Sequence, residues 1–307
     1  ALVDRGEQVV VLDNLSTGLR WLISDKATFV HGEAGDQELT RSLLREHKIE
    51  SVIHFAGSIV VPESVGQPLA YYDNNVVASR ALIEACVAEG VKHFLFSSTA
   101  TVYAVDAKQP LAEAEPKDPI SPYARSKLMT EWMLEDVSRA TALRSMRLRY
   151  FNVAGADPSG RTGQSSPKAT HLIKRACQVA LGRVPYLDIF GTDYPTPDGT
   201  GIRDYIHVSD LVDAHLLALD ALRGGAESSV YNVGYGRGLS VREVVRGMES
   251  VIGGPLPLKE SPRRAGDPPI LISDPSRIKA ALGWRPRHAD LSEIIRSALE
   301  WERRFNA

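Results

Sequence analysis

The first half of the chain alternates short apolar runs with longer segments of helical periodicity. The apolar runs have the length of buried strands and cover residues 8–12, 28–31, 51–55, 93–97 and 145–150. Helices are expected at residues 36–47, 75–89 and 123–141. Strands separated by helices of this length predict a parallel sheet covered on both faces, which is a doubly wound α/β domain.

The second half of the chain has a different character. Residues 152–201 are rich in Gly, Pro, Ser and Thr, which is typical of loops that wrap a ligand. Further helices are expected at residues 208–222, 241–251 and 291–305, and a strand at 229–233. We therefore predict a smaller α/β domain towards the C-terminus.

The start of the chain lacks the strand, glycine-rich turn and helix that usually open a doubly wound domain. Residues 1–6 (ALVDRG) resemble the last turn of a helix that Gly6 ends. The next element is already a strand ending in an acidic residue, Asp13. We expect a first strand and a phosphate-binding loop, about 20 residues in all, to precede Ala1.

Composition and charge exclude several classes of protein. Hydrophobic residues make up 43% of the chain and charged residues 24%, as in an ordinary globular protein. The net charge, 36 − 38 = −2, offers no basic excess for nucleic acid or a membrane surface. The two cysteines, Cys86 and Cys177, lie in separate helix-like segments without a metal-binding or disulfide pattern. No apolar run approaches a membrane span. We expect a cytoplasmic protein without a metal site.

Tyr123 and Lys127 lie four residues apart at the start of an expected helix, so their side chains share one face. An ammonium beside a phenol is expected to lower the pKa of Tyr123 towards neutrality, which makes it a usable general base. Thr99 follows the strand at 93–97, where residues face the ligand crevice of a parallel sheet. Tyr-x-x-x-Lys alone is a weak pattern, but the order and spacing of all three residues are those of the short-chain dehydrogenase/reductase triad.

Asp13 and Asn14 follow the strand at 8–12. A carboxylate at this point can accept hydrogen bonds from the adenosine ribose and would repel a 2′-phosphate, which favours NAD over NADP. A simple turn formed by the Asp-Asn pair is the alternative when these residues are taken alone.

Ten segments extend the comparison over essentially all 307 residues. They are DNLSTG (13–18), HFAG (54–57), YDNNV (72–76), SSTATVY (97–103), SPYARSKLM (121–129), RYFNVAGA (149–156), FGTDYP (190–195), DGTGIRDYIHV (198–208), RRAGD (263–267) and LGW (282–284). Together they resemble the UDP-glucose 4-epimerases, which are extended short-chain dehydrogenase/reductases. The resemblance implies tightly held NAD and the interconversion of UDP-glucose and UDP-galactose by transient oxidation at sugar C4.

The resemblance also implies roles for individual residues. Tyr123 would remove the proton of the sugar 4-hydroxyl, Lys127 would bind the nicotinamide ribose, and Thr99 would hydrogen-bond the substrate oxygen. The implied NAD-binding residues are Asp13, Asn14, Glu33, Phe55, Ala56, Gly57, Asn74, Thr99, Tyr123, Lys127, Tyr150 and Phe151. The implied substrate-binding residues are Thr99, Tyr123, Asn152, Leu172, Phe190, Arg203, Tyr205, Arg264 and Asp267. The two arginines suit a diphosphate, because guanidinium groups pair with phosphate oxygens.

Domain boundaries and assembly follow from the same resemblance. Residues 1–151, with 208–235 returning to them, would form an NAD-binding Rossmann-like domain. Residues 152–207 and 236–307 would form the nucleotide-sugar-binding domain. Members of the family are commonly homodimers, so we expect a homodimer.

Three alternative functions are weighed against this interpretation. His171 stands where many family members have asparagine, and Leu271 stands where a larger aromatic residue often limits the sugar pocket. The smaller Leu271 favours an epimerase that also accepts N-acetylated UDP-sugars. A 4,6-dehydratase is set aside, because Ala100 and Thr101 occupy the positions of its acid and base. A catalytically impaired module that binds NAD or nucleotide sugar stays open, although the complete triad argues against it.

Overall fold

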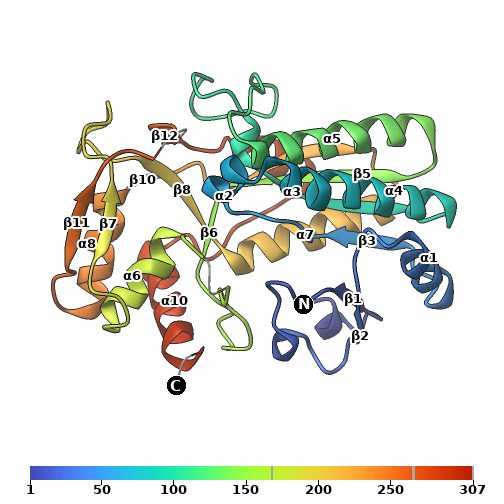
Figure 1. The fold of residues 1–307 in the computed structure, drawn as a ribbon, viewed down its shortest axis with the longest axis horizontal. Helices are drawn as coiled ribbons and strands as arrows, with labels where there is room; N and C mark the ends of the chain where they lie inside the picture. Colours follow the sequence, from blue (N-terminus) through green and yellow to red (C-terminus); the bar gives the residue numbers. More distant parts are fainter. Residues whose placement is uncertain (167–168, 265–266, 306–307) are drawn as a thin grey trace. The chain divides into compact units, whose positions relative to one another are not determined.

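The structure, a computed structural model, describes residues 1–166, 169–264 and 267–305. These residues divide into two compact units (Figure 1). The first unit consists of residues 1–104, 117–149 and 214–231, and the second of residues 105–116, 150–213 and 232–307. Each unit therefore combines segments that are distant in the sequence.

Parallel strands form the framework of the first unit. β1 (Val10–Asp13) pairs with β2 (Thr28–His31). The larger sheet has the order β3 (Ser51–His54), β4 (His93–Thr99), β5 (Arg144–Tyr150) and β9 (Ser229–Val233). Among the described residues these are two separate sheets. The predicted parallel α/β architecture is confirmed, and the strand expected before Ala1 stays a prediction.

The register of β3 and β4 determines where the segments that follow them lie. Ser51 pairs with His93 and His54 pairs with Phe96, in parallel. Because the carboxyl ends of parallel strands meet at one edge of a sheet, residues 55–58 and 99–101 leave at the same edge. The segments predicted to carry the chemistry are thereby brought close together.

Capping residues determine where two predicted helices of the first unit begin. α1 (Gln37–Glu46) starts after Asp36, whose carboxylate accepts a hydrogen bond from the Leu39 N–H at 3.1 Å. α5 (Pro122–Ala140) starts after Ser121, whose hydroxyl accepts the Ala124 N–H at 3.2 Å. Pro122 suits the first helical position, because its fixed φ is helical and it has no N–H to leave unpaired. Both helices lie within two residues of their predicted bounds.

The helix predicted at residues 75–89 begins earlier than expected. α2 (Val61–Gly66) and α3 (Pro68–Tyr72) precede a π-helical turn, Asp73–Val77, which runs into α4 (Ala78–Ala88). Apolar periodicity does not reveal the π-helical turn, because the turn inserts one residue into the helical repeat. Such turns often occur at functional sites, and this one carries Asn74 and Asn75.

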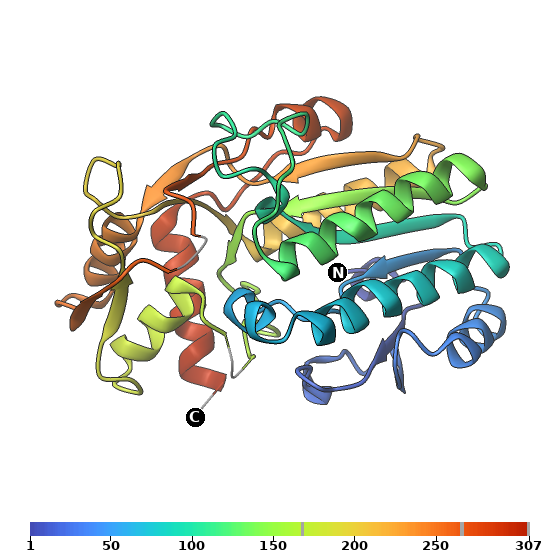
Figure 2. The same ribbon diagram turned by 45° about the horizontal axis from the view of Figure 1, so that its top comes forward.

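The core of the first unit lies between its helices and the larger sheet. α5 packs against β4 and α4, and Figure 2 shows α4 and α5 running side by side. One cluster of buried residues in this core consists of Leu44, Leu82, Ile83, Ala85, Cys86, Val91, Phe94, Phe96, Leu134 and Leu143. None of the helices in the described part of the chain is long and apolar enough to cross a bilayer.

β8 is the central strand of the second unit. β8 (Ile202–His207) pairs antiparallel with β10 (Gly238–Ser240) and parallel with β6 (Asn152–Ala154) and β12 (Ile270–Leu271). β7 (Leu187–Phe190) and β11 (Leu258–Ser261) form a separate two-stranded parallel sheet. β6 and β7 lie in a stretch whose composition predicts loops, because such short strands are defined mainly by distant partners.

Three helices of the second unit enclose its core. The helices of this part of the chain are α6 (Leu172–Ala180), α7 (Val208–Arg223), α8 (Val241–Ile252), α9 (Ser276–Leu282) and α10 (Leu291–Phe305). α7 runs on into the first unit. α6, α8 and α10 pack together in Figure 1, around Cys177, Met248 and Ile295. The predicted helix around Cys177 is confirmed.

The compact units differ from the predicted domains at residues 105–116, 150–151, 208–213 and 232–235, which lie in the second unit. The Leu111 N–H donates to the Ile272 carbonyl at 2.8 Å, and Glu113 accepts the Asn232 N–H at 2.8 Å. These partners are far apart in the sequence, so local pattern could not indicate them.

Candidate active site

The three predicted catalytic residues lie on β4 and α5 of the first unit. Thr99 ends β4, and its hydroxyl accepts a hydrogen bond from the Thr101 N–H at 3.2 Å. The Thr99 hydroxyl lies close enough to the Tyr123 phenol to lower the pKa of Tyr123. Lys127 lies one turn after Tyr123 on the same helix and is 3% exposed. The fold thus brings the two hydroxyls together and buries the ammonium on the same face of α5.

The Lys127 ammonium has few partners in the protein. Its nitrogen lies 4.9 Å from the centroid of the Phe96 ring, and burial lowers the pKa of Lys127 to about 8. Within residues 1–166, 169–264 and 267–305, no acceptor forms a hydrogen bond with it. A buried donor without an acceptor is costly unless a ligand supplies one, and the ribose of a dinucleotide carries such oxygens. Lys127 therefore fits a cofactor-binding role.

The expected effect of Lys127 on the pKa of Tyr123 is wrong for the protein chain itself. Burial raises the pKa of Tyr123, and the hydrogen bond from Thr99 lowers it only in part. Lys127 does not contribute to the shift. The spacing of the two residues predicted their common helix face, but it could not reveal how strongly burial would favour the neutral phenol.

A buried network supports the end of β4. The Ser98 hydroxyl donates to Glu131, which pairs with the Arg149 guanidinium. Arg149 also donates to the Tyr103 hydroxyl at 2.8 Å. Arg149 and Glu131 are only 3% and 6% exposed. The network ties β4, α5 and β5 together directly behind Thr99, and the sequence analysis did not single it out.

Asp13 and Asn14 form the turn that was the simpler alternative for this pair. Asp13 Oδ1 accepts the Leu15 N–H at 2.7 Å, and Asn14 Oδ1 accepts the Ser16 N–H at 2.9 Å. The Asn14 amide also donates to both carboxylate oxygens of Glu33 at 3.1 Å. The three predicted cofactor residues therefore adjoin one another, and Asp13 Oδ2 has no donor among the described residues.

The segment after β3 is open to a ligand. Phe55 is 57% exposed, Ala56 is exposed, and Gly57 has a φ of +147°, which side-chain-bearing residues rarely adopt. A Cβ at Gly57 would lie 3.0 Å from Asn75 Oδ1 and 3.6 Å from Lys127 Nζ. This exposed segment and the ammonium beside it fit NAD, with the predicted Asn74 close by.

Asn75 is a supporting residue that the sequence analysis missed. Its side chain accepts the Ser58 N–H at 2.7 Å and donates to the Ser58 carbonyl at 2.9 Å. It also donates to Ser126 Oγ on α5 at 3.0 Å. The neighbouring Asn74, which was predicted, donates to Ser58 Oγ at 2.9 Å. Only the π-helical turn decides which of the two asparagines is buried.

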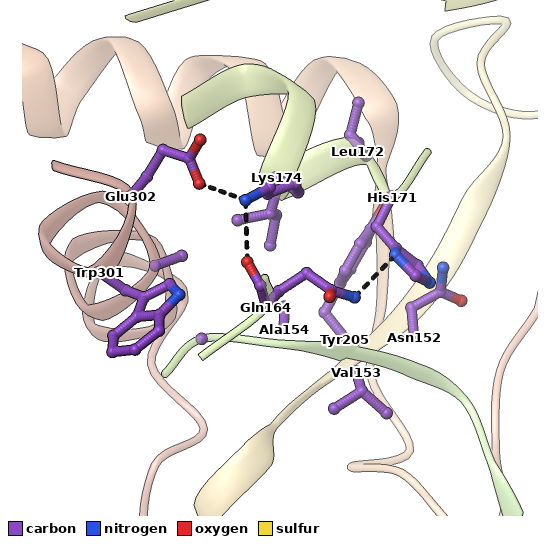
Figure 3. Close-up of a pocket in the computed structure, with 13 residues that line it drawn as sticks. Asn152, Val153, Ala154, Gln164, His171, Leu172, Lys174, Tyr205, Trp301 and Glu302 are labelled. Carbon is purple, nitrogen blue, oxygen red and sulfur yellow. Dashed lines mark hydrogen bonds and ion pairs between the residues drawn. The ribbon is translucent and has the colours of Figure 1, made fainter. Parts of the chain in front are cut away.

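Apart from Thr99 and Tyr123, the predicted substrate residues lie in the second unit. Asn152, Leu172 and Tyr205 line a cavity beside β6, α6 and α10 (Figure 3). The cavity also has lining residues that the sequence analysis did not predict and that no local pattern marks. Among them are Gln164, Lys174, Trp301 and Glu302.

The remaining predicted substrate residues form two pairs. Arg203 makes an ion pair with Asp267, and the Arg264 guanidinium lies 3.9 Å from the centroid of the Phe190 ring. Residues 265 and 266, within the RRAGD segment, lie outside the described residues. The second unit thus offers two guanidinium groups, one of which, that of Arg264, lies over an aromatic ring. Guanidinium groups suit the phosphates of a nucleoside diphosphate.

Three predicted positions offer less open surface. Phe151 is buried, and its N–H donates to the Val233 carbonyl at 3.3 Å, while Tyr150 is half-buried. Leu271 is buried in β12, in register with Arg203. It does not line the cavity among the described residues, so its effect on N-acetylated sugars stays a prediction.

Comparison with known proteins extends this picture. The model of the NAD dependent epimerase/dehydratase family matches residues 1–234. A UDP-glucose 4-epimerase of Azospirillum brasilense is 56% identical over 303 residues, which cover 99% of this chain and 87% of that protein.

Solved structures agree with the sequence match. A UDP-glucose 4-epimerase from Brucella ovis in complex with NAD is 42% identical, with a TM-score of 0.94 over 97% of this chain and 92% of that chain. An epimerase of the same name from Bifidobacterium longum, in complex with NAD+ and UDP, is 35% identical. Its TM-score is 0.92 over 99% of this chain and 93% of that chain.

Proposed function

Since the chain belongs to the NAD-dependent epimerase/dehydratase family, we propose that it interconverts UDP-glucose and UDP-galactose. The observation that carries the proposal is the placement of Thr99, at the end of β4, beside Tyr123, with Lys127 buried one turn later on α5. The likeness to an epimerase structure with bound NAD and UDP supports the cofactor and the class of substrate.

The chain's own residues handle the proton at the sugar 4-hydroxyl. Tyr123 accepts this proton and later returns it, and the Thr99 hydrogen bond favours the phenolate against the effect of burial. Lys127 would donate a hydrogen bond to the nicotinamide ribose. NAD, when bound, would supply the site that takes the hydride from sugar C4 and returns it to the opposite face of the sugar. Arg203 and Arg264 hold the diphosphate.

A tyrosine substitution tests the mechanism. Tyr123→Phe removes only the ionisable oxygen, so turnover of UDP-galactose should fall at least about 100-fold while the fold is retained. Tyr186→Phe is the matched control, because Tyr186 is 37% exposed and lies outside the site. Turnover of the Tyr123→Phe variant equal to that of the control would refute the role of Tyr123.

Two further measurements separate the alternatives. Bound NAD without epimerisation in the wild-type protein would favour a catalytically impaired binding module. Turnover of UDP-N-acetylgalactosamine comparable with that of UDP-galactose would extend the activity to N-acetylated sugars, and no turnover would end that alternative.

We also propose that the protein is a cytoplasmic homodimer. Exposed apolar side chains support the dimer, because Val87 on α4 and Trp132 on the adjacent α5 are 37% and 55% exposed. Light scattering should give twice the mass of the 33.6 kDa chain. Trp132→Glu should give the monomer mass, and a dimer of unchanged stability would exclude this surface.

A further inference from the structure

A glutamine and a histidine face each other in the cavity of the second unit. His171 comes directly before α6 but makes no capping hydrogen bond with its side chain. Gln164 Nε2 lies 3.4 Å from His171 Nδ1 (Figure 3). In the same view the imidazole lies beside the Asn152 side chain, so both residues adjoin the proposed substrate space.

A neighbouring backbone group determines the orientation of the Gln164 amide. The Ser166 N–H donates to Gln164 Oε1 at 3.1 Å, and a backbone N–H can only donate. The atom facing Ser166 is therefore the carbonyl oxygen, and the NH2 group faces His171. Since an NH2 group also only donates, His171 Nδ1 must accept and cannot carry a proton.

The proton of the neutral imidazole must then lie on Nε2. In the charged imidazolium, an Nδ1–H would face the NH2 group of Gln164, and the two donors would oppose each other. His171 is exposed, and partial desolvation together with the Arg264 guanidinium lowers its pKa. Hydrogen bonding and charge therefore favour the same neutral form.

The other titratable groups of the cavity leave this balance unchanged. Lys174 and Glu302 form an ion pair, being 7% and 1% exposed, and Glu302 also pairs with Arg183 at 3.0 Å. Burial raises the pKa of Tyr205, which keeps its phenol neutral. Lys174 also donates to the Gln164 backbone carbonyl at 2.8 Å. Lys174 thus anchors Gln164, and its cluster with Glu302 and Arg183 adds no net negative charge that would favour the imidazolium.

We propose that Gln164 is a positioning residue that holds His171 in its neutral Nε2–H form, so that His171 presents a single N–H donor to an oxygen of the UDP-sugar. Only the identity of this ligand rests on the proposed function, because the protonation of His171 is a property of the free protein. A neutral donor makes substrate affinity insensitive to pH near neutrality. An imidazolium would instead bind the diphosphate more strongly as the pH falls.

Gln164→Glu tests the proposal in the full chain. The carboxylate accepts a hydrogen bond from Nδ1–H of the imidazolium, so the pKa of His171 should rise by about one unit or more. The 15N shifts of the imidazole distinguish the two neutral tautomers and the imidazolium. The chain has 8 histidines, and the signal of His171 is identified by its absence in His171→Asn. The KM for UDP-galactose should depend on pH in Gln164→Glu but not in the wild type.

The matched control is Gln178→Glu, which adds the same charge on α6 beside Arg175. This variant should leave the imidazole signals and the pH dependence of KM unchanged. An Nδ1–H tautomer in the wild-type protein, or an unchanged His171 pKa in Gln164→Glu, would overturn the proposal. Since the 15N signals require no turnover, this outcome is distinct from a failure of the proposed epimerase activity.

Discussion

The buried pair of Glu131 and Arg149 offers a direct test of how the catalytic strand is held. Glu131 accepts the Arg149 Nε–H at 2.9 Å and a second Arg149 N–H, and it also accepts the Ser98 hydroxyl. Glu131→Gln preserves the shape of the side chain but removes its charge. The guanidinium then stays buried without a counter-charge, and the new NH2 group must face one of these donors.

The expected cost follows from burial. Removing one partner of a buried ion pair costs about 3–5 kcal/mol, because the remaining charge is left without compensation. The matched control is Asp136→Asn on the same helix, whose ion pair with Arg139 is 80% and 70% exposed. That substitution should cost less than about 1 kcal/mol.

Hydrogen exchange at a fixed NAD concentration is the appropriate assay, because it reports the opening of β4 and β5 in the first unit separately from the second unit. Adding Arg149→Met to Glu131→Gln should recover part of the loss, since it removes the uncompensated charge. Equal costs for Glu131→Gln and Asp136→Asn, or a double variant with fully additive losses, would refute the reasoning.

Three other predictions concern the same unit. Lys127→Met should abolish turnover but keep the free energy of unfolding within about 1 kcal/mol of the wild type. The substitution loses a cation–π contact but also removes a buried charge, and these two effects oppose each other. A loss above about 3 kcal/mol in a denaturant titration would argue against this balance. Gly57→Ala should destabilise the protein by about 1–3 kcal/mol, because φ is +147° and the new Cβ meets Asn75. The variant should also retain less NAD on purification. If it retained as much NAD as the wild type, a role of residues 55–58 in binding NAD would be contradicted. Burial lowers the pKa of His54 to about 3, whereas the same side chain in the unfolded chain has a pKa of about 6.5. Between these two pH values, unfolding takes up a proton. The free energy of unfolding therefore falls as the pH drops from about 6.5 towards 3. His54→Gln should flatten that slope in urea titrations, and an unchanged slope would assign it to other groups.

Periodicity was sufficient for the elements whose signals are local. β2 and β9 have the predicted bounds, and α5 begins at Pro122 because Ser121 caps it and proline suits its first position. The π-helical turn and the short strands β6 and β7 were not predicted. One interrupts the helical repeat, and the others are defined by partners far along the chain.

For the active site, the sequence by itself determined which residues carry chemistry and in what order: Thr99, Tyr123 and Lys127 at a strand end and a helix start, and a carboxylate at Asp13. Helix geometry and parallel strand direction made these inferences possible. Only the tertiary structure decided the energetics. Burial raises the pKa of Tyr123, contrary to the expected effect of the lysine, and lowers that of Lys127. The supporting contacts of Asn75 and of the Glu131–Arg149 pair were likewise decided by the fold, because desolvation and long-range pairing depend on the whole surrounding structure rather than on spacing along the chain.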